Sequence, residues 1–267
     1  MLIVKYEGLD ADEHRLDAHF GGESLAGLGH ALTLVSHYAS TGIVRQRAPY
    51  SEDARFYFTG AQNGSLDWLV QLVTSNPDAI IVGLGINGVT ELVKYIFLRA
   101  IGKSSKINSS GVKELDENRS GDLEALIEAV EPSLKRAHRA IDESAKTITI
   151  INGNNNHVMV GFDHSSKRYL EDDVDTGQDQ QDVSVASLNV NSKYGRVYFG
   201  DLKRTIPFRI DRNASGRTLT ELSRGLDDYA KKTGLEVNIT FSRIEAVDGR
   251  LKRILIHDAR HLQSDDH

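Results

Sequence analysis

The chain has 267 residues, of which 39% are hydrophobic and 26% are charged, and its formal net charge is -6. These proportions are typical of a globular protein and exclude a collagenous, low-complexity or disordered chain. The absence of cysteine excludes a disulfide scaffold, thiolate catalysis and a zinc site with cysteine ligands. The N-terminal sequence turns acidic early and lacks the cationic start of a signal peptide, so we expect a cytoplasmic protein.

The first 175 residues predict an α+β domain, in which helices pack on a mixed sheet. Apolar residues at helical spacing predict helices at 24–39 and 122–144, with Pro132 as a break or kink in the second. The polar stretch 103–121 predicts a mobile loop. Alternation and turn residues predict strands at 2–7, 14–19, 43–47, 55–59, 66–72, 147–151 and 158–162, with a hairpin turn at Asn63-Gly64.

The apolar segment 79–101 allows three interpretations. Its glycines at 83, 85 and 88 match a dinucleotide-binding pattern, but the second strand that such a fold requires does not follow. Glu91 and Lys94 offset the apolar gain of a membrane span. We expect a core helix packed on a sheet, with a membrane or oligomer contact as the alternative. The stripe that predicts this helix is Val89, Leu92, Val93, Ile96, Phe97 and Ala100.

Charge divides the chain into two parts. Residues 183–260 carry 15 Lys and Arg against 9 Asp and Glu, a net charge of +6. Residues 1–182 carry 17 against 27, a net charge of -10. The sign changes at the acidic stretch 171–182, whose composition favours a linker or long loop. We therefore expect an acidic domain at 1–175, a linker at 176–182, a basic domain at 183–260 and a tail at 261–267.

The basic domain has the predicted element order β-β-β-α-β-β. A capping-box pattern opens its helix at Thr218, and Gly234 ends it. Five short strands with a helix between the third and the fourth are typical of a five-stranded OB-type barrel, although other small barrels and α+β domains share this order. The strands are expected at 183–190, 196–199, 205–210, 235–241 and 251–257.

No catalytic or metal-binding motif is present in the sequence. It contains no H-E-x-x-H, no G-x-S-x-G and no complete P-loop. His30 and His37 lie two helical turns apart, too far to chelate one ion together. We expect no metal and no cofactor. For an enzyme site without a known motif, the group to inspect is His157, Asp163 and His164.

Basic and aromatic residues alternate along the predicted barrel. This combination suits single-stranded nucleic acid, because phosphates need positive charge and bases need stacking surfaces. The alternative is a face that docks on the chain's own acidic domain, on another subunit or on a protein partner. The candidate residues are Lys193, Tyr194, Arg196, Tyr198, Lys203, Arg204 and Arg209 on the first three strands, and Arg243, Arg250, Lys252 and Arg253 at the last hairpin.

Short motifs in the first domain accompany this barrel, namely Gly22-Glu-Ser-Leu-Ala-Gly27, Thr41-Gly42 and Asn63-Gly-Ser-Leu-Asp-Trp68. Together they resemble an uncharacterised family of two-part proteins of bacteria and their mobile elements. The resemblance implies a two-part architecture and a prokaryotic setting, and it carries no activity.

We therefore expect a non-enzymatic binding or assembly protein. Its barrel would engage nucleic acid or a protein partner, and its N-terminal helices would build a homo-oligomer. One alternative is a membrane-acting effector, for example in phage defence, that uses the segment 79–101. Another is an enzyme whose site has no recognisable motif.

Overall fold

The computed structural model describes residues 1–61, 66–81 and 83–262. The predicted turn at Asn63-Gly64 and most of the predicted tail therefore lie outside the described residues. The chain divides into two compact units, which are each discontinuous in sequence. Unit 1 comprises Met1–Glu114 and Leu126–Glu171, and unit 2 comprises Leu115–Ala125 and Asp172–His267.

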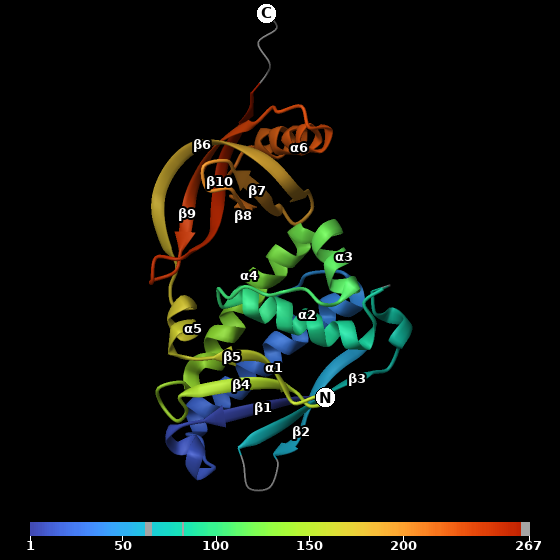
Figure 1. The fold of residues 1–267 in the computed structure, drawn as a ribbon, viewed down its shortest axis with the longest axis vertical. Coiled ribbons are helices and arrows are strands. Elements are labelled where there is room, and N and C mark those ends of the chain that lie inside the picture. Colours follow the sequence, from blue (N-terminus) through green and yellow to red (C-terminus); the bar gives the residue numbers. More distant parts are fainter. Residues whose placement is uncertain (62–65, 82, 263–267) are drawn as a thin grey trace, which may run out of the picture. The chain divides into compact units, whose positions relative to one another are not determined.

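Unit 1 contains a five-stranded antiparallel sheet with the order β2-β3-β1-β4-β5 (Figure 1). The central strand shows why this sequence forms a sheet with one covered face. Leu2, Val4 and Tyr6 are buried, whereas the residues between them are partly exposed, as expected for side chains that alternate between two faces. The strands are β1 (Leu2–Glu7), β2 (Ala54–Ala61), β3 (Asp67–Thr74), β4 (Thr147–Asn152) and β5 (His157–Phe162).

Helices pack on one face of this sheet, with α1 against β2 and α2 against β5 (Figure 1). The whole stripe predicted for the segment 79–101, from Val89 to Ala100, is buried with no exposed area, so the predicted core helix is confirmed. No helix among the described residues is long and apolar enough to cross a membrane. The helical elements are η1 (Leu9–Glu13), α1 (Ala18–Thr41), η2 (Pro77–Ala79), α2 (Gly85–Ala100), α3 (Ser110–Asn118), α4 (Ser120–Ala137), η3 (His138–Ala140) and α5 (His164–Tyr169).

Three local predictions for the first domain are wrong. The predicted strand at 14–19 contains the start of α1, because the Asp17 side chain accepts hydrogen bonds from two backbone N–H groups and caps the helix. The predicted strand at 43–47 is irregular chain after α1 has ended. The predicted loop at 103–121 contains α3 and the start of α4, since Val112 and Leu115 are buried on one side of α3. Pro132 lies inside α4.

Gly27 allows α1 to approach α4 closely, and this contact gives a first testable prediction. A Cβ atom at Gly27 would lie 2.5 Å from the backbone nitrogen of Ala137 and 2.6 Å from the carbonyl oxygen of Ser133. Because backbone atoms cannot rotate away, Gly27→Ala should lower the free energy of unfolding by about 1–3 kcal/mol. Urea denaturation followed by circular dichroism measures this loss.

Gly22 provides the matched control for Gly27, because it lies in the same helix with open space around its Cα. Gly22→Ala should raise the free energy of unfolding by about 0.5–1 kcal/mol, since alanine favours the helix over glycine. Equal stabilisation by both substitutions would contradict the close approach of the two helices.

Unit 2 is built around a closed barrel with the strand order β10-β8-β7-β6-β9. Its neighbouring strands are antiparallel except β8 and β10, which run parallel. A five-stranded barrel with one helix between its third and fourth strands is OB-type, so the predicted barrel is confirmed. The elements are β6 (Val174–Asn189), β7 (Tyr194–Phe199), β8 (Arg204–Ile210), α6 (Gly216–Lys231), β9 (Val237–Glu245) and β10 (Leu251–His261).

The helix α6 packs on β6, β9 and β10 at the end of the barrel where β9 begins. Leu222 joins the barrel core. Gly225 is the point of closest approach, because a Cβ there would lie 2.3 Å from a methyl group of Val237 and 3.1 Å from one of Val185. The helix therefore covers this end of the barrel.

The acidic stretch predicted as a linker at 176–182 is part of a strand. Residues 174–183 pair with β9 over Val237–Glu245, and their side chains are mostly exposed. Backbone pairing with β9 stabilises this half of β6 without requiring apolar side chains, which explains why composition alone favoured a loop. The predicted boundary at 175 also falls inside β6.

Candidate binding site on the barrel

The outer face of β7 and β8 contains four of the predicted site residues. Tyr194, Arg196 and Tyr198 alternate along β7 with buried residues. Tyr194 lies opposite Arg209, and Tyr198 lies opposite Thr205. Since directly paired residues share a face of the sheet, the structure brings these aromatic and cationic side chains together. In OB-type barrels, the face of the second and third strands binds oligonucleotides and oligosaccharides.

The segment Leu115–Ala125 lies against this face, and we call it the covering segment. Arg196 Nε donates a hydrogen bond of 2.7 Å to Glu124 Oε1, and Arg196 Nη2 donates one of 2.7 Å to Asp116 Oδ1. Arg196 is 16% exposed and Glu124 only 4%. The charge of the most central cation on this face is therefore neutralised by two carboxylates of the chain itself.

Two further contacts hold the covering segment against the barrel. A Cβ at Gly121 would lie 2.6 Å from the carbonyl oxygen of Tyr194, so only glycine allows this approach. Asn189 Nδ2 donates a hydrogen bond of 2.7 Å to Asp122 Oδ1. Burial raises the pKa of the Asp122 carboxyl, against an opposing effect of Arg119.

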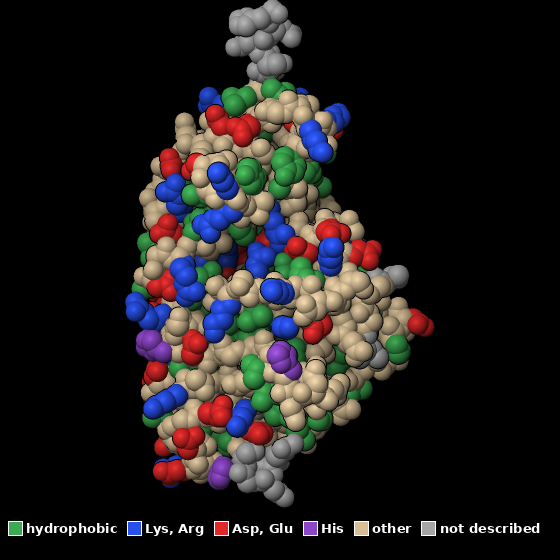
Figure 2. Space-filling model, viewed as in Figure 1, with side chains coloured by type: hydrophobic (Ala, Val, Ile, Leu, Met, Phe, Trp, Pro, Cys, Tyr) green, Lys and Arg blue, Asp and Glu red, His purple; other side chains and the backbone are tan. Residues whose placement is uncertain are grey.

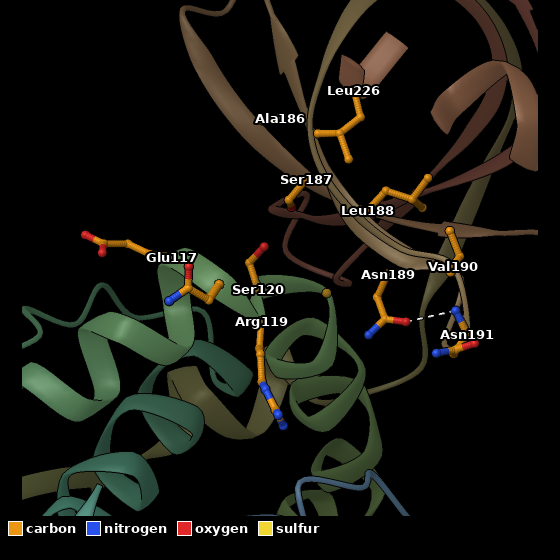
Figure 3. A pocket seen from close by; sticks show the side chains of 12 residues that line it. Glu117, Arg119, Ser120, Ala186, Ser187, Leu188, Asn189, Val190, Asn191 and Leu226 are labelled. Carbon is orange, nitrogen blue, oxygen red and sulfur yellow. Dashed lines mark hydrogen bonds between the residues drawn. The ribbon is translucent and has the colours of Figure 1, made fainter. Parts of the chain in front are cut away.

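A cavity of about 420 Å³ lies between the covering segment and the end of β6 (Figure 3). Ser187 Oγ is buried there and has no hydrogen-bond partner within the described parts of the chain. The lining mixes acidic, basic, amide and apolar groups, so it favours neither an anion nor a cation. Its labelled residues are Glu117, Arg119, Ser120, Ala186, Ser187, Leu188, Asn189, Val190, Asn191 and Leu226.

The cations predicted at the last hairpin do not form an exposed patch. The guanidinium of Arg250 donates hydrogen bonds of 2.9 and 2.7 Å to Asp248 Oδ2. The side chain of Lys252 is 2% exposed, and its Nζ lies 2.6 Å from Asp173 Oδ1. Arg253 is 9% exposed. The pairing register shifts between Leu251 and Arg253, and this break in alternation accompanies the burial of two consecutive cations.

Arg243 lies on β9 close to the rim of the barrel. Its Nη2 donates a hydrogen bond of 3.0 Å to Asp179 Oδ2, and its guanidinium lies 5.7 Å from the centre of the Phe241 ring. Lys193, Lys203 and Arg204 differ from the other cations. Their side chains are exposed, and within the described residues no ion pair holds them. Lys203 and Arg204 are adjacent at the turn between β7 and β8, whereas Lys193 lies in the turn between β6 and β7.

The net charge of unit 2 differs from that of the sequence segment 183–260. The strand β6 and the covering segment add mostly acidic residues, so unit 2 contains 16 Lys and Arg against 20 Asp and Glu, a net charge of -4. Figure 2 shows Lys and Arg side chains interspersed with Asp and Glu side chains on one face of the molecule. The folded unit therefore has no excess of positive charge.

The end of the barrel that α6 does not cover contains a second cavity, of about 240 Å³. We call it the open-end cavity. Leu202, which is 47% exposed, lies at its rim in the turn between β7 and β8. None of the predicted site residues except Arg243 lines this cavity, and its one sign in the sequence is Leu202, an apolar residue in a polar turn. The lining residues are Gln181, Phe199, Asp201, Leu202, Ile206, Phe241, Arg243, Glu245, Leu251 and Ile254.

The structure does not bring the group proposed for an enzyme site together. His157 is exposed on β5. Asp163 caps α5 and lies 3.2 Å from Lys103 Nζ. His164 Nδ1 lies 2.9 Å from a carboxylate oxygen of Asp142. The described part of the chain holds no group of three or more His, Asp or Glu side chains that could bind a metal ion.

These observations define a two-unit α+β protein with an OB-type barrel. Residues 2–171 match a family model described as a domain of unknown function, DUF7946, and the chain belongs to this family. Residues 179–260 match a second model, a family of unknown function, DUF7947. No curated protein matches the chain. The uncharacterised, two-part character predicted from the short motifs is confirmed, whereas the bacterial and mobile-element setting stays a prediction.

Proposed function

We propose that the protein is a non-enzymatic binding protein whose barrel docks a segment of a protein partner at the open-end cavity. The observation that carries this proposal is the contrast between two surfaces of unit 2. Arg196 on the β7–β8 face and Arg250 and Lys252 at the last hairpin have carboxylate partners inside the unit. The lining of the open-end cavity combines six apolar side chains with four polar or charged ones, and an exposed leucine lies at its rim.

Charge favours a protein partner over nucleic acid. Affinity for nucleic acid depends on Lys and Arg side chains that replace the counterions of phosphates, and unit 2 has a net charge of -4. Protein interfaces instead depend on a few apolar or aromatic side chains that fill pockets in the partner. The open-end cavity supplies such a pocket, whose polar lining residues are Gln181, Asp201, Arg243 and Glu245.

A selection with short random peptides displayed on phage tests this proposal on the full chain. Peptides that bind the full chain should share an apolar residue. In fluorescence anisotropy, Leu202→Asp should weaken their binding by about tenfold or more, because it places a charge at the rim of the pocket. The matched control is Val190→Asp, which changes an apolar residue with 52% exposure at the opposite end of the barrel and should leave binding unchanged.

Two results would contradict the docking proposal. The first is a failure of any peptide to bind the full chain, or equal binding to the wild type and to Leu202→Asp. The second is tight binding of labelled single-stranded oligonucleotides that weakens steeply with salt and is lost on charge reversal of Lys203 and Arg204. That pattern would assign the open end to nucleic acid.

The remaining hypotheses from the sequence stay predictions. The membrane hypothesis depends on the segment 79–101, whose apolar stripe is buried inside unit 1. The homo-oligomer was expected to form through the N-terminal helices. In the structure, the exposed apolar side chains of the unit 1 sheet include Tyr57, Val73 and Val158 on its strands.

A further inference from the structure

The first half of β6 pairs with another strand, β9, along one of its two edges. Residues 174–183 pair with β9, and β7 pairs with β6 from Ser184 to Asn189. Within the described parts of the chain, no strand pairs with the second edge of residues 174–182. Figure 1 shows β6 as a long curved strand whose first half runs beside β9. The side chains of residues 174–182 are exposed, apart from the partly buried Gln181.

This edge runs beside the open-end cavity. Gln181 of β6 lines the cavity directly. Asp179 holds Arg243, a second lining residue, through the hydrogen bond of 3.0 Å. Side chains of an extended strand alternate between two faces. A strand added along this edge would therefore direct every second side chain toward the rim of the cavity.

We propose that β6 accepts an extended segment of the protein partner as an added strand along residues 178–182, with one apolar side chain of that segment in the open-end cavity. This inference rests on the proposed function and specifies how the partner binds. In such strand addition, backbone hydrogen bonds provide affinity, and pockets for alternate side chains provide specificity.

The charge of the edge specifies the partner further. Residues 174–182 contain three Asp and no Lys or Arg. Asp175 accepts a hydrogen bond from the Ser242 hydroxyl, and Asp182 accepts one from the Asn238 amide. These donors are neutral, so Asp175 and Asp182 keep their negative charge, whereas Asp179 is paired with Arg243. We infer that the partner segment carries Lys or Arg beside its apolar residue.

The same charges argue against a second copy of this chain as the occupant. Pairing of two β6 edges would place Asp residues of one copy near Asp residues of the other, and like charges across strands are destabilising. Gly177, with a φ of 84°, and a register shift between Asp175 and Gln178 also interrupt the edge. Charges and bulges of this kind limit nonspecific pairing of edge strands. The regular stretch available to the partner is therefore 178–182.

Disulfide crosslinking can test the strand register, because the chain contains no cysteine of its own. Gln180→Cys would place a single thiol on the edge of the full chain. The probes are the peptides selected on the full chain, each resynthesised with one cysteine moved along its length. Crosslinking should peak at one position and alternate with a period of about two residues. Thr220→Cys, at an exposed site on α6, is the matched control and should not crosslink.

Two further measurements separate strand addition from simple docking. Backbone N-methylation of the peptide removes a donor without changing the side chain. At alternate positions, it should weaken binding by about tenfold, the effect of one or two lost hydrogen bonds. Asp182→Lys should weaken the binding of basic peptides several-fold, since it reverses a charge on the edge.

The outcomes distinguish the two levels of the proposal. One outcome is that selected peptides bind the wild type and that Leu202→Asp abolishes this binding. At the same time, N-methylation is tolerated at every peptide position, and Gln180→Cys gives no alternating crosslinks. Strand addition is then overturned while docking at the open-end cavity stands. If no peptide binds the full chain at all, the proposed function itself fails.

Discussion

Replacement of Arg196 by methionine is expected to lower the free energy of unfolding of unit 2 by about 3–5 kcal/mol, the usual cost of leaving one partner of a buried ion pair alone. The reason is the burial of Glu124, whose side chain is 4% exposed and loses its hydrogen bond of 2.7 Å from Arg196. Asp116, which is 23% exposed, also loses its hydrogen bond of 2.7 Å from Arg196. Hydrogen exchange of the β7 amides under increasing urea reports this loss within unit 2.

Two variants control for other effects of the Arg196 substitution. Removing the carboxylates together with the cation, as in Arg196→Met with Asp116→Asn and Glu124→Gln, should recover most of the lost stability, because no buried charge then remains unpaired. Arg204→Met changes an exposed cation on the neighbouring strand. It should change the free energy of unfolding by at most about 0.5 kcal/mol. A loss below about 1 kcal/mol for Arg196→Met would show that the covering segment does not depend on this ion pair.

Acid is expected to destabilise unit 1 through His138. The ring is 1% exposed. Its Nδ1 lies 2.7 Å from the carbonyl oxygen of Leu134, and its Nε2 lies 2.9 Å from Ser166 Oγ. Burial lowers the pKa of His138 from 6.5 to about 4, against a smaller opposing effect of the Leu134 carbonyl.

The direction of the pH dependence follows from this lowered pKa. Below pH 6.5, the unfolded chain binds a proton at His138 that the folded chain does not. The contribution of neutral His138 to the free energy of unfolding is therefore fully present above pH 6.5. It is lost as the pH decreases toward about 4, by a total on the order of 3 kcal/mol. Urea denaturation at several pH values measures this slope.

His138→Gln should flatten the slope even if it lowers stability at neutral pH, because glutamine does not titrate. Part of the slope should persist, since burial also lowers the pKa values of His30 and His37. An unchanged slope in the variant would contradict the assignment to His138.

The sequence predicted those parts of the fold that depend on local patterns. The buried stripe of α2 repeats at helical spacing, and its burial follows from that spacing. The barrel order was predicted from short strands, and in two of them the buried Val197, Phe199, Ile206 and Phe208 alternate with partly exposed residues. These patterns are complete within a few residues, so they can be recognised without knowledge of distant contacts.

Long-range pairing determines the parts that the sequence did not predict. The first half of β6 has no apolar alternation, and it is a strand because β9 pairs with it. The cations of the candidate site show the same limit. Arg196 meets partners that lie 72 and 80 residues earlier in the chain. Lys252 and Arg253 are buried where the register of β10 shifts. The predicted site residues are close in sequence, but they therefore do not form one exposed surface.

The discontinuous make-up of unit 2 limits how this barrel can move between proteins. A gene fragment that encodes residues 172–267 would leave out Leu115–Ala125, and with it Asp116 and Glu124, the carboxylates that partner Arg196. Recombination at the unit boundary would thus transfer a barrel whose Arg196 has lost these two carboxylates. The barrel and the covering segment that supplies Asp116 and Glu124 are therefore expected to be inherited together, as one heritable module encoded in two separate stretches of the gene.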